Sequence, residues 1–194
     1  MKDTPQNLSP LSVGLHWLVG VFVIAMLALG LAMEEFELRF LYPVHKSIGI
    51  ILFAFIVWRV WWRALNGWLP PLGDEPRWQR IAARATHWVL LVGTLLMPLS
   101  GIIMSIADGR GLAVFGVELL AANLNAAGRV AALSEPLEHL MHTIHAVTGK
   151  TLIAAIALHT GAALWHHLIL KDGTLRRMLA RPITVQPGTE NAGN

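Results

Sequence analysis

The chain has 194 residues, of which 55% are hydrophobic and only 14% are charged. Soluble domains carry about 25% charged residues, so this composition argues against a soluble globular protein. The absence of cysteine excludes disulfides, iron–sulfur clusters, zinc fingers, thiol catalysis and a cysteine-attached c-type haem. The sequence pI of about 9.8 fits Lys and Arg at membrane faces better than nucleic-acid binding. We therefore expect an integral membrane protein.

Four apolar segments are long enough to cross a bilayer, which takes roughly 20 residues per helix. The predicted helices cover residues 11–33, 41–62, 85–107 and 135–168. Ser9 and Pro10 predict the start of the first helix, because Ser caps helix N-termini and Pro suits the first helical position. The predicted fold class is therefore all-α, an integral membrane four-helix bundle. We expect a single membrane domain over 8–181, followed by a disordered tail over 182–194.

The Lys and Arg residues divide unequally between the two ends of this bundle. Ten fall at one end: Lys2, Arg59, Arg63, Arg77, Arg80, Arg84, Lys171, Arg176, Arg177 and Arg181. Five fall at the other: Arg39, Lys46, Arg110, Arg129 and Lys150. Because cytoplasmic loops carry the excess of Lys and Arg, we predict that both termini are cytoplasmic. The long outer connection over 108–133 is apolar enough to lie along the membrane interface.

Histidine is frequent for so apolar a chain, and ionisable residues at membrane depth are candidates for function. Without cysteine, imidazole suits haem iron, zinc, copper or a proton path. The nine histidines are His16, His45, His87, His139, His142, His145, His159, His166 and His167.

Spacing arranges four of these histidines into two pairs. His145 and His159 are 14 residues apart, so they lie near one helix face and about 21 Å apart along the axis. They cannot share one metal ion. His16 lies early in a helix that enters from the cytoplasm and matches His159 in depth. His45 lies near the start of a helix that enters from outside and matches His145. We predict an inner pair, His16 with His159, and an outer pair, His45 with His145.

Two features leave alternatives open. His87 begins the third helix at the inner level and competes with His16, although it can also be an interfacial histidine beside Trp88. Small residues lie close to the paired histidines: Gly20, Gly49, Gly149 and Gly161. Glycine lets a flat macrocycle approach the backbone, but it serves helix–helix packing in membranes equally well.

The order and spacing of these motifs resemble the bacterial cytochrome b561 family, a four-helix membrane di-haem b fold. The resemblance covers about residues 8–181. The segments that carry it are Leu15-His16-Trp17-Leu18, Val44 to Gly49, His87 with Pro98, His145 through Gly149 to His159, His166-His167 and Lys171 to Leu175.

The resemblance implies two haem b groups, with His16 and His159 on the inner iron and His45 and His145 on the outer iron. It implies an electron-transfer oxidoreductase, multi-pass in the bacterial inner membrane, with membrane lipid and quinone as partners. One member type oxidises superoxide at the periplasmic face and reduces ubiquinone. Iron held by two imidazoles has no open position, which favours outer-sphere electron transfer.

The outer face carries charges of both signs. Lys46, Arg129, Lys150 and a protonated His142 could attract superoxide, but acidic residues share that face: Glu34, Glu35, Glu37, Glu135 and Glu138. An alternative function is a cytochrome b subunit that links a periplasmic dehydrogenase or hydrogenase to the quinone pool. A histidine-lined metal or proton transporter is a third hypothesis. It predicts intramembrane carboxylates, and the acids of this sequence fall in loops and tails.

Overall fold

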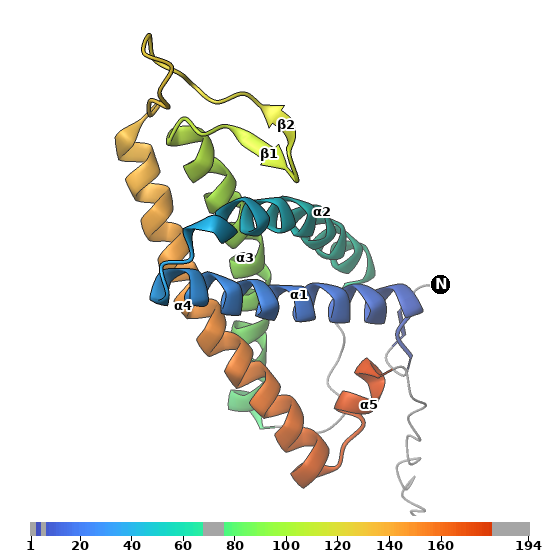
Figure 1. The fold of residues 1–194 in the computed structure, drawn as a ribbon. Coiled ribbons are helices and arrows are strands. Elements are labelled where there is room, and N and C mark those ends of the chain that lie inside the picture. The colour runs from blue at the N-terminus through green and yellow to red at the C-terminus, as the bar shows by residue number, and fades with distance from the viewer. Residues whose placement is uncertain (1–2, 5–6, 68–75, 180–194) are drawn as a thin grey trace, which may run out of the picture.

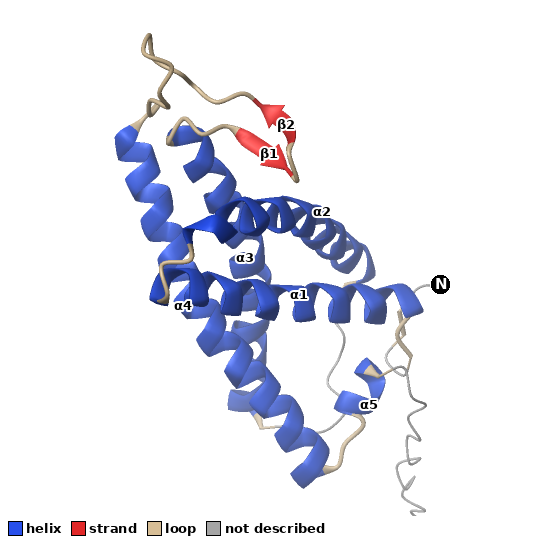
Figure 2. Ribbon diagram, viewed as in Figure 1, coloured by secondary structure: helices blue, strands red, loops and turns tan. Residues whose placement is uncertain are grey.

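Four long helices dominate the computed structural model, which describes residues 3–4, 7–67 and 76–179 (Figures 1 and 2). They are α1 (Pro10–Glu35), α2 (Tyr42–Asn66), α3 (Arg77–Ala107) and α4 (Glu135–Trp165). The helix α4 continues through a π-helical turn, η2 (His166–Leu170), to the short α5 (Thr174–Met178). All four long segments have the length and apolarity of membrane-spanning helices. The predicted all-α membrane fold is confirmed; the tail over 182–194 lies outside the described residues.

The helix ends follow local sequence signals. The helix α1 starts at Pro10, and the side chain of Ser9 accepts a hydrogen bond from the backbone N–H of Ser12, as a cap does. The helix α3 begins at Arg77, well before the predicted residue 85. The prediction was confined to the charge-free stretch, whereas the polar turns from Arg77 to Arg84 extend the helix beyond it.

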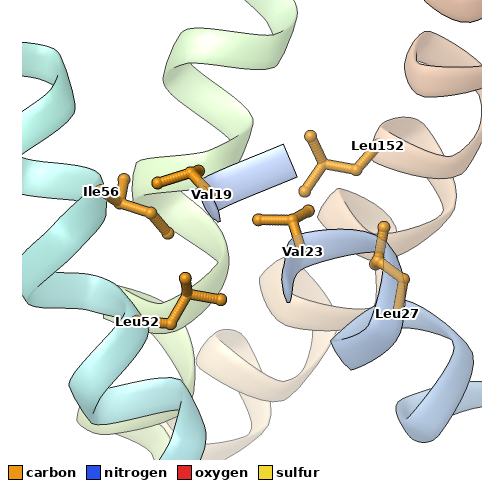
Figure 3. Packing of buried hydrophobic residues seen from close by; sticks show 6 residues of the cluster. All are labelled: Val19, Val23, Leu27, Leu52, Ile56 and Leu152. Carbon is orange, nitrogen blue, oxygen red and sulfur yellow. The ribbon is translucent and has the colours of Figure 1, made fainter. Parts of the chain in front are cut away.

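The helices associate as α1 with α2 and α3 with α4, and α2 also packs against α3. In Figure 1 the α1/α2 pair crosses the α3/α4 pair. The core where the pairs meet consists of Val19, Val23, Leu27, Leu52, Ile56 and Leu152 (Figure 3). No more than 22% of the most apolar window of any span is buried. Many large apolar side chains of the four helices are exposed instead, as expected for helices surrounded by lipid.

The connection between α3 and α4 contains a β-hairpin, which the sequence analysis did not predict. Strands β1 (Leu112–Val114) and β2 (Val117–Leu120) pair antiparallel, and the two residues at the tip have positive φ, 48° at Phe115 and 87° at Gly116. This is the turn conformation that two-residue hairpins favour. The backbone N–H of Phe115 donates to Ser47 Oγ at 2.9 Å, which attaches the hairpin to the start of α2. A short helical turn, η1 (Arg39–Leu41), precedes α2.

Candidate functional site

The structure brings together the four histidines in the pairs that their predicted depths indicate. The ring centres of His45 and His145 are 6.4 Å apart, and those of His16 and His159 are 6.2 Å apart. Two imidazoles on opposite sides of one metal ion, each with a bond of about 2 Å, place their ring centres about 6 Å apart. Both pairs therefore have the spacing of two axial ligands. Their role as ligands remains a prediction.

At the outer pair, hydrogen bonds orient His145. Its Nδ1 lies 2.8 Å from the carbonyl oxygen of Met97 and 3.1 Å from Ser100 Oγ. Because a carbonyl only accepts, Nδ1 carries the proton and donates, so the lone pair is on Nε2. This is the tautomer that binds a metal through Nε2. Nδ1 of His45 is buried with no hydrogen-bond partner among the described residues.

A cavity of about 310 Å³ lies between α1, α2, α3 and α4 at the outer pair. Four of its lining residues are glycines: Gly30, Gly49, Gly101 and Gly149. A Cβ at Gly101 would lie 3.1 Å from Cε1 of His145, so any larger residue would push against the imidazole. The cavity, its glycine lining and the two imidazoles that also line it fit a flat macrocycle held by two histidines.

The sequence pattern alone does not predict that two of these glycines, Gly30 and Gly101, lie beside the outer pair. Gly101 lies on α3, the helix of His87, yet it faces His145 on the neighbouring α4. Gly30 lies near His45, because a Cβ at this glycine would be 3.7 Å from Cε1 of that ring. Residue spacing within one helix cannot predict these two contacts, because each joins residues of two different helices.

The inner pair has a third histidine beside it. The ring centre of His87, on α3, is 5.4 Å from that of His159, so the competition with His16 recognised in the sequence is present in space. Nη2 of Arg59 lies 3.0 Å from Nδ1 of His16. Arginine only donates, so this contact places the ring proton of His16 on Nε2. The two centres thus have similar ring separations and opposite hydrogen bonding.

The apolar core separates the two pairs. Leu152 is fully buried on α4, seven residues from both His145 and His159, and it packs with residues of α1 and α2 (Figure 3). Because both histidines lie on one continuous helix, their backbone positions are about 21 Å apart. A packed hydrocarbon layer therefore lies between the centres.

Charged side chains of both signs line the outer cavity. Nζ of Lys46 donates to Ser105 Oγ at 2.9 Å, and Ser105 donates to the carbonyl of Gly111 at 2.8 Å. Lys150, His142 and Glu34 also line the cavity. Arg129, the other cation predicted to attract superoxide, is an exposed residue beyond the hairpin and is not among the lining residues.

At the opposite end, the π-helical turn brings His166 to Asp172. Nδ1 of His166 hydrogen-bonds Oδ2 of Asp172, and the backbone N–H of Thr174 donates to Oδ1 at 2.9 Å. Burial alone would raise the pKa of Asp172, but these hydrogen bonds outweigh it and lower the pKa below its usual value. The carboxylate thereby fixes the turn that leads into α5.

The comparisons with known proteins agree with this architecture. The family model described as prokaryotic cytochrome b561 matches residues 7–181. The chain belongs to this family. It is 35% identical over 187 residues to cytochrome b561 homolog 2 of Escherichia coli K12, covering 92% of this chain and 94% of the relative. It is 28% identical over 183 residues to a probable superoxide oxidase, CybB, of Yersinia pestis, covering 89% and 96%.

A third relative, cytochrome b561 homolog 1 of Escherichia coli K12, is 29% identical over 184 residues, with coverage of 89% and 97%. Membership of the prokaryotic cytochrome b561 family implies haem b and electron-transfer chemistry. With four spanning helices, the protein is a multi-pass membrane cytochrome. The outer cavity and its histidines fit the prosthetic group that the family implies.

Proposed function

We propose that the protein transfers electrons across the bacterial inner membrane between two haem b groups. His45 and His145 hold the outer haem, and His16 and His159 hold the inner one. The observation that carries this proposal is the repeated ring separation, 6.4 Å and 6.2 Å, at two depths of one helix. The Lys and Arg excess at the inner end supports an orientation with both termini in the cytoplasm.

When bound, haem b would supply one-electron transfer, and the paired imidazoles would hold its iron without a place for a further ligand. The chain itself contributes orientation and insulation. Met97 and Ser100 fix the ring of His145, so Nε2 is held in one direction. Leu152 and the core around it exclude water between the two centres. The helix α4 carries both His145 and His159 on one rigid element.

For the reaction, we propose oxidation of superoxide outside and reduction of ubiquinone. Two superoxide anions lose one electron each and become O₂, and ubiquinone takes both electrons and two protons to become ubiquinol. Lys46, Lys150 and the acidic Glu34 line the outer cavity. Two positive charges against one negative charge give this cavity a net positive charge, which would attract a small anion. The name of the Yersinia pestis relative, probable superoxide oxidase, also supports this substrate.

The experiment is stopped-flow spectroscopy of the purified, haem-loaded protein in ubiquinone-containing vesicles. We expect superoxide to reduce the haems, and ubiquinone then to re-oxidise them. Lys150→Glu should slow the first step roughly tenfold at low salt and less at high salt, because salt screens the attraction of an anion. Arg129→Glu makes the same charge change away from the cavity and should leave this rate nearly unchanged.

The β-hairpin favours a second candidate function. Its tip and outer strand expose large apolar side chains: Phe115 (63%), Val117 (65%) and Leu119 (58%). Exposed apolar surface beside a redox centre suits docking of a protein donor, such as a periplasmic dehydrogenase or hydrogenase. If ubiquinone re-oxidises both haems but superoxide never reduces them, the superoxide proposal is wrong and the docked protein donor becomes the favoured hypothesis.

A further inference from the structure

We propose that Arg59 and Arg63 bind the propionate carboxylates of the inner haem. This inference rests on the proposed function, since it assigns side chains to the inner prosthetic group. Both arginines belong to α2, one helical turn apart, and therefore lie on the same face of the helix. Together they form a line of positive charge that leads from the inner histidines toward the end of the helix.

The first argument is position. Arg59 is half-buried, and its Nη2 is 3.0 Å from Nδ1 of His16, so its guanidinium is already in contact with an inner ligand candidate. Arg63 follows at the next turn, with Nη1 3.6 Å from Oδ2 of Asp3. A carboxylate attached to a ring between His16 and His159 is therefore within reach of this line of cations.

The second argument is charge. Guanidinium groups inside spanning helices are costly and are normally paired with an anion. Asp3 is the carboxylate that Arg63 meets among the described residues, and its single negative charge can offset only one of the two guanidinium groups. Its oxygens accept hydrogen bonds from the backbone N–H of Ser9 at 2.9 Å and from Ser12 Oγ at 2.8 and 2.7 Å.

The arginines retain donors that these contacts do not use. Nε of Arg63 is buried and has no hydrogen-bond partner among the described residues. The hydrogen bond of Arg59 goes to an imidazole, which carries no negative charge. Arg63 Nη2 also donates to the carbonyl of Gly67, which leaves its Nε as the open donor. A propionate carboxylate would offer these guanidinium groups the charged acceptor that arginine binds most strongly.

The third argument concerns the tautomer of His16. The contact from Arg59 places the ring proton on Nε2, whereas an iron bond through Nε2 requires the lone pair there. A carboxylate that takes over the hydrogen bonds of Arg59 frees Nδ1 of His16 to carry the proton instead. Haem b would therefore need His16 as a ligand and would also carry the carboxylate that draws Arg59 away from Nδ1 of His16.

A phosphate of a membrane lipid offers similar oxyanion chemistry, and the test separates the two sources. Protein with the His45→Ala change, freed of haem, is titrated with haem b or with its dimethyl ester, which keeps the iron and ring but lacks the carboxylate charges. We expect the ester to bind the inner centre at least about tenfold more weakly, as the loss of charged hydrogen bonds predicts. This comparison needs no arginine variant and so does not depend on one folding.

Variants then assign the effect to residues. Arg59→Leu and Arg63→Leu should lower the affinity for haem b toward that for the ester, so the discrimination disappears. Arg176→Leu removes an exposed cation of α5 and should retain the discrimination in full.

Equal binding of haem b and its ester to the inner centre would overturn the carboxylate site while leaving the proposed function intact. If, in addition, the arginine variants lose co-purified lipid phosphorus, the anion is a lipid phosphate. Failure of any haem to bind the inner centre would instead contradict the proposed function itself, and this inference with it.

Discussion

The outer and inner histidine pairs have nearly the same ring separation but opposite surroundings. At the outer pair, His145 donates to the carbonyl of Met97 within a glycine-lined cavity. At the inner pair, His16 accepts from Arg59, and His87 lies beside His159. His145 is thus already held in the tautomer that leaves its Nε2 free for a metal, whereas His16 would require an exchange of hydrogen bonds to serve as the proposed inner ligand.

This difference shows that ring spacing and hydrogen bonding carry separate information. Ring spacing is set by the helices and indicates where a metal fits between two imidazoles. Hydrogen bonding at Nδ1 decides which nitrogen carries the lone pair, and therefore which centre is preorganised. We expect the outer centre to take up haem without rearrangement and the inner centre to depend on its arginines.

The largest expected effect is the loss of one haem with one ligand. His145→Ala should lower the haem content from two to one per chain, because a five-coordinate outer haem is held weakly, while the inner haem remains. Pyridine haemochrome assay against protein concentration measures this ratio. His139→Ala, which removes an exposed histidine of the same helix, should retain both haems. Loss of both haems from His145→Ala would show that the two centres are not independent.

The choice of inner ligand is tested by a second pair of variants. His16→Ala should lose the inner haem, whereas His87→Ala should keep it, because the 6.2 Å separation of His16 from His159 matches the outer pair more closely than the 5.4 Å of His87. Haem content and the visible spectrum report the result. The reverse outcome would transfer the inner ligand from α1 to α3.

A smaller effect is expected from the hydrogen bonds of His145. Ser100→Ala removes one partner of Nδ1 but leaves the carbonyl of Met97 in place. We expect outer-haem affinity to fall about fivefold, the equivalent of about 1 kcal/mol for one hydrogen bond. Haem-transfer kinetics to a soluble acceptor would measure it. An unchanged rate would mean that the Met97 carbonyl alone orients the ring.

The sequence was sufficient to predict the four helices and the proximity of the paired histidines. Apolar segment length determines the spans, and alternating helix direction determines which histidines share a depth. Contacts between helices could not be predicted from the sequence, because they depend on how each helix is rotated and where the helices cross. Two such contacts are that of Gly101 with His145 and that of Arg59 with His16.

The hairpin was missed for a different reason. Residues 112–120 are apolar apart from Glu118, and such a run favours a segment lying along the membrane interface. A Gly at a tip between two short runs rich in Leu and Val is also a hairpin signal. The strand pairing and the hydrogen bond to Ser47 become visible only in the folded chain.

The smallest expected effect concerns Asp172. Because its pKa is lowered in the folded protein, the stability that it contributes is present at neutral pH and is lost as the pH falls below 3.8. Asp172→Asn should therefore destabilise the protein at pH 7 by about 1 kcal/mol or less, given the partial exposure of the site. Thermal unfolding in detergent measures the difference, which should vanish at low pH. A difference that persists at low pH would assign the effect to packing instead.

The most direct test of the two-centre account combines haem stoichiometry with low-temperature electron paramagnetic resonance of the oxidised wild-type protein. Two opposed imidazole pairs predict two haem b per chain, both low-spin, since each iron has two strong axial ligands. Reduction should convert both to the spectrum of six-coordinate haem b. A ratio of one haem per chain, or a high-spin signal from one of two haems, would contradict the account.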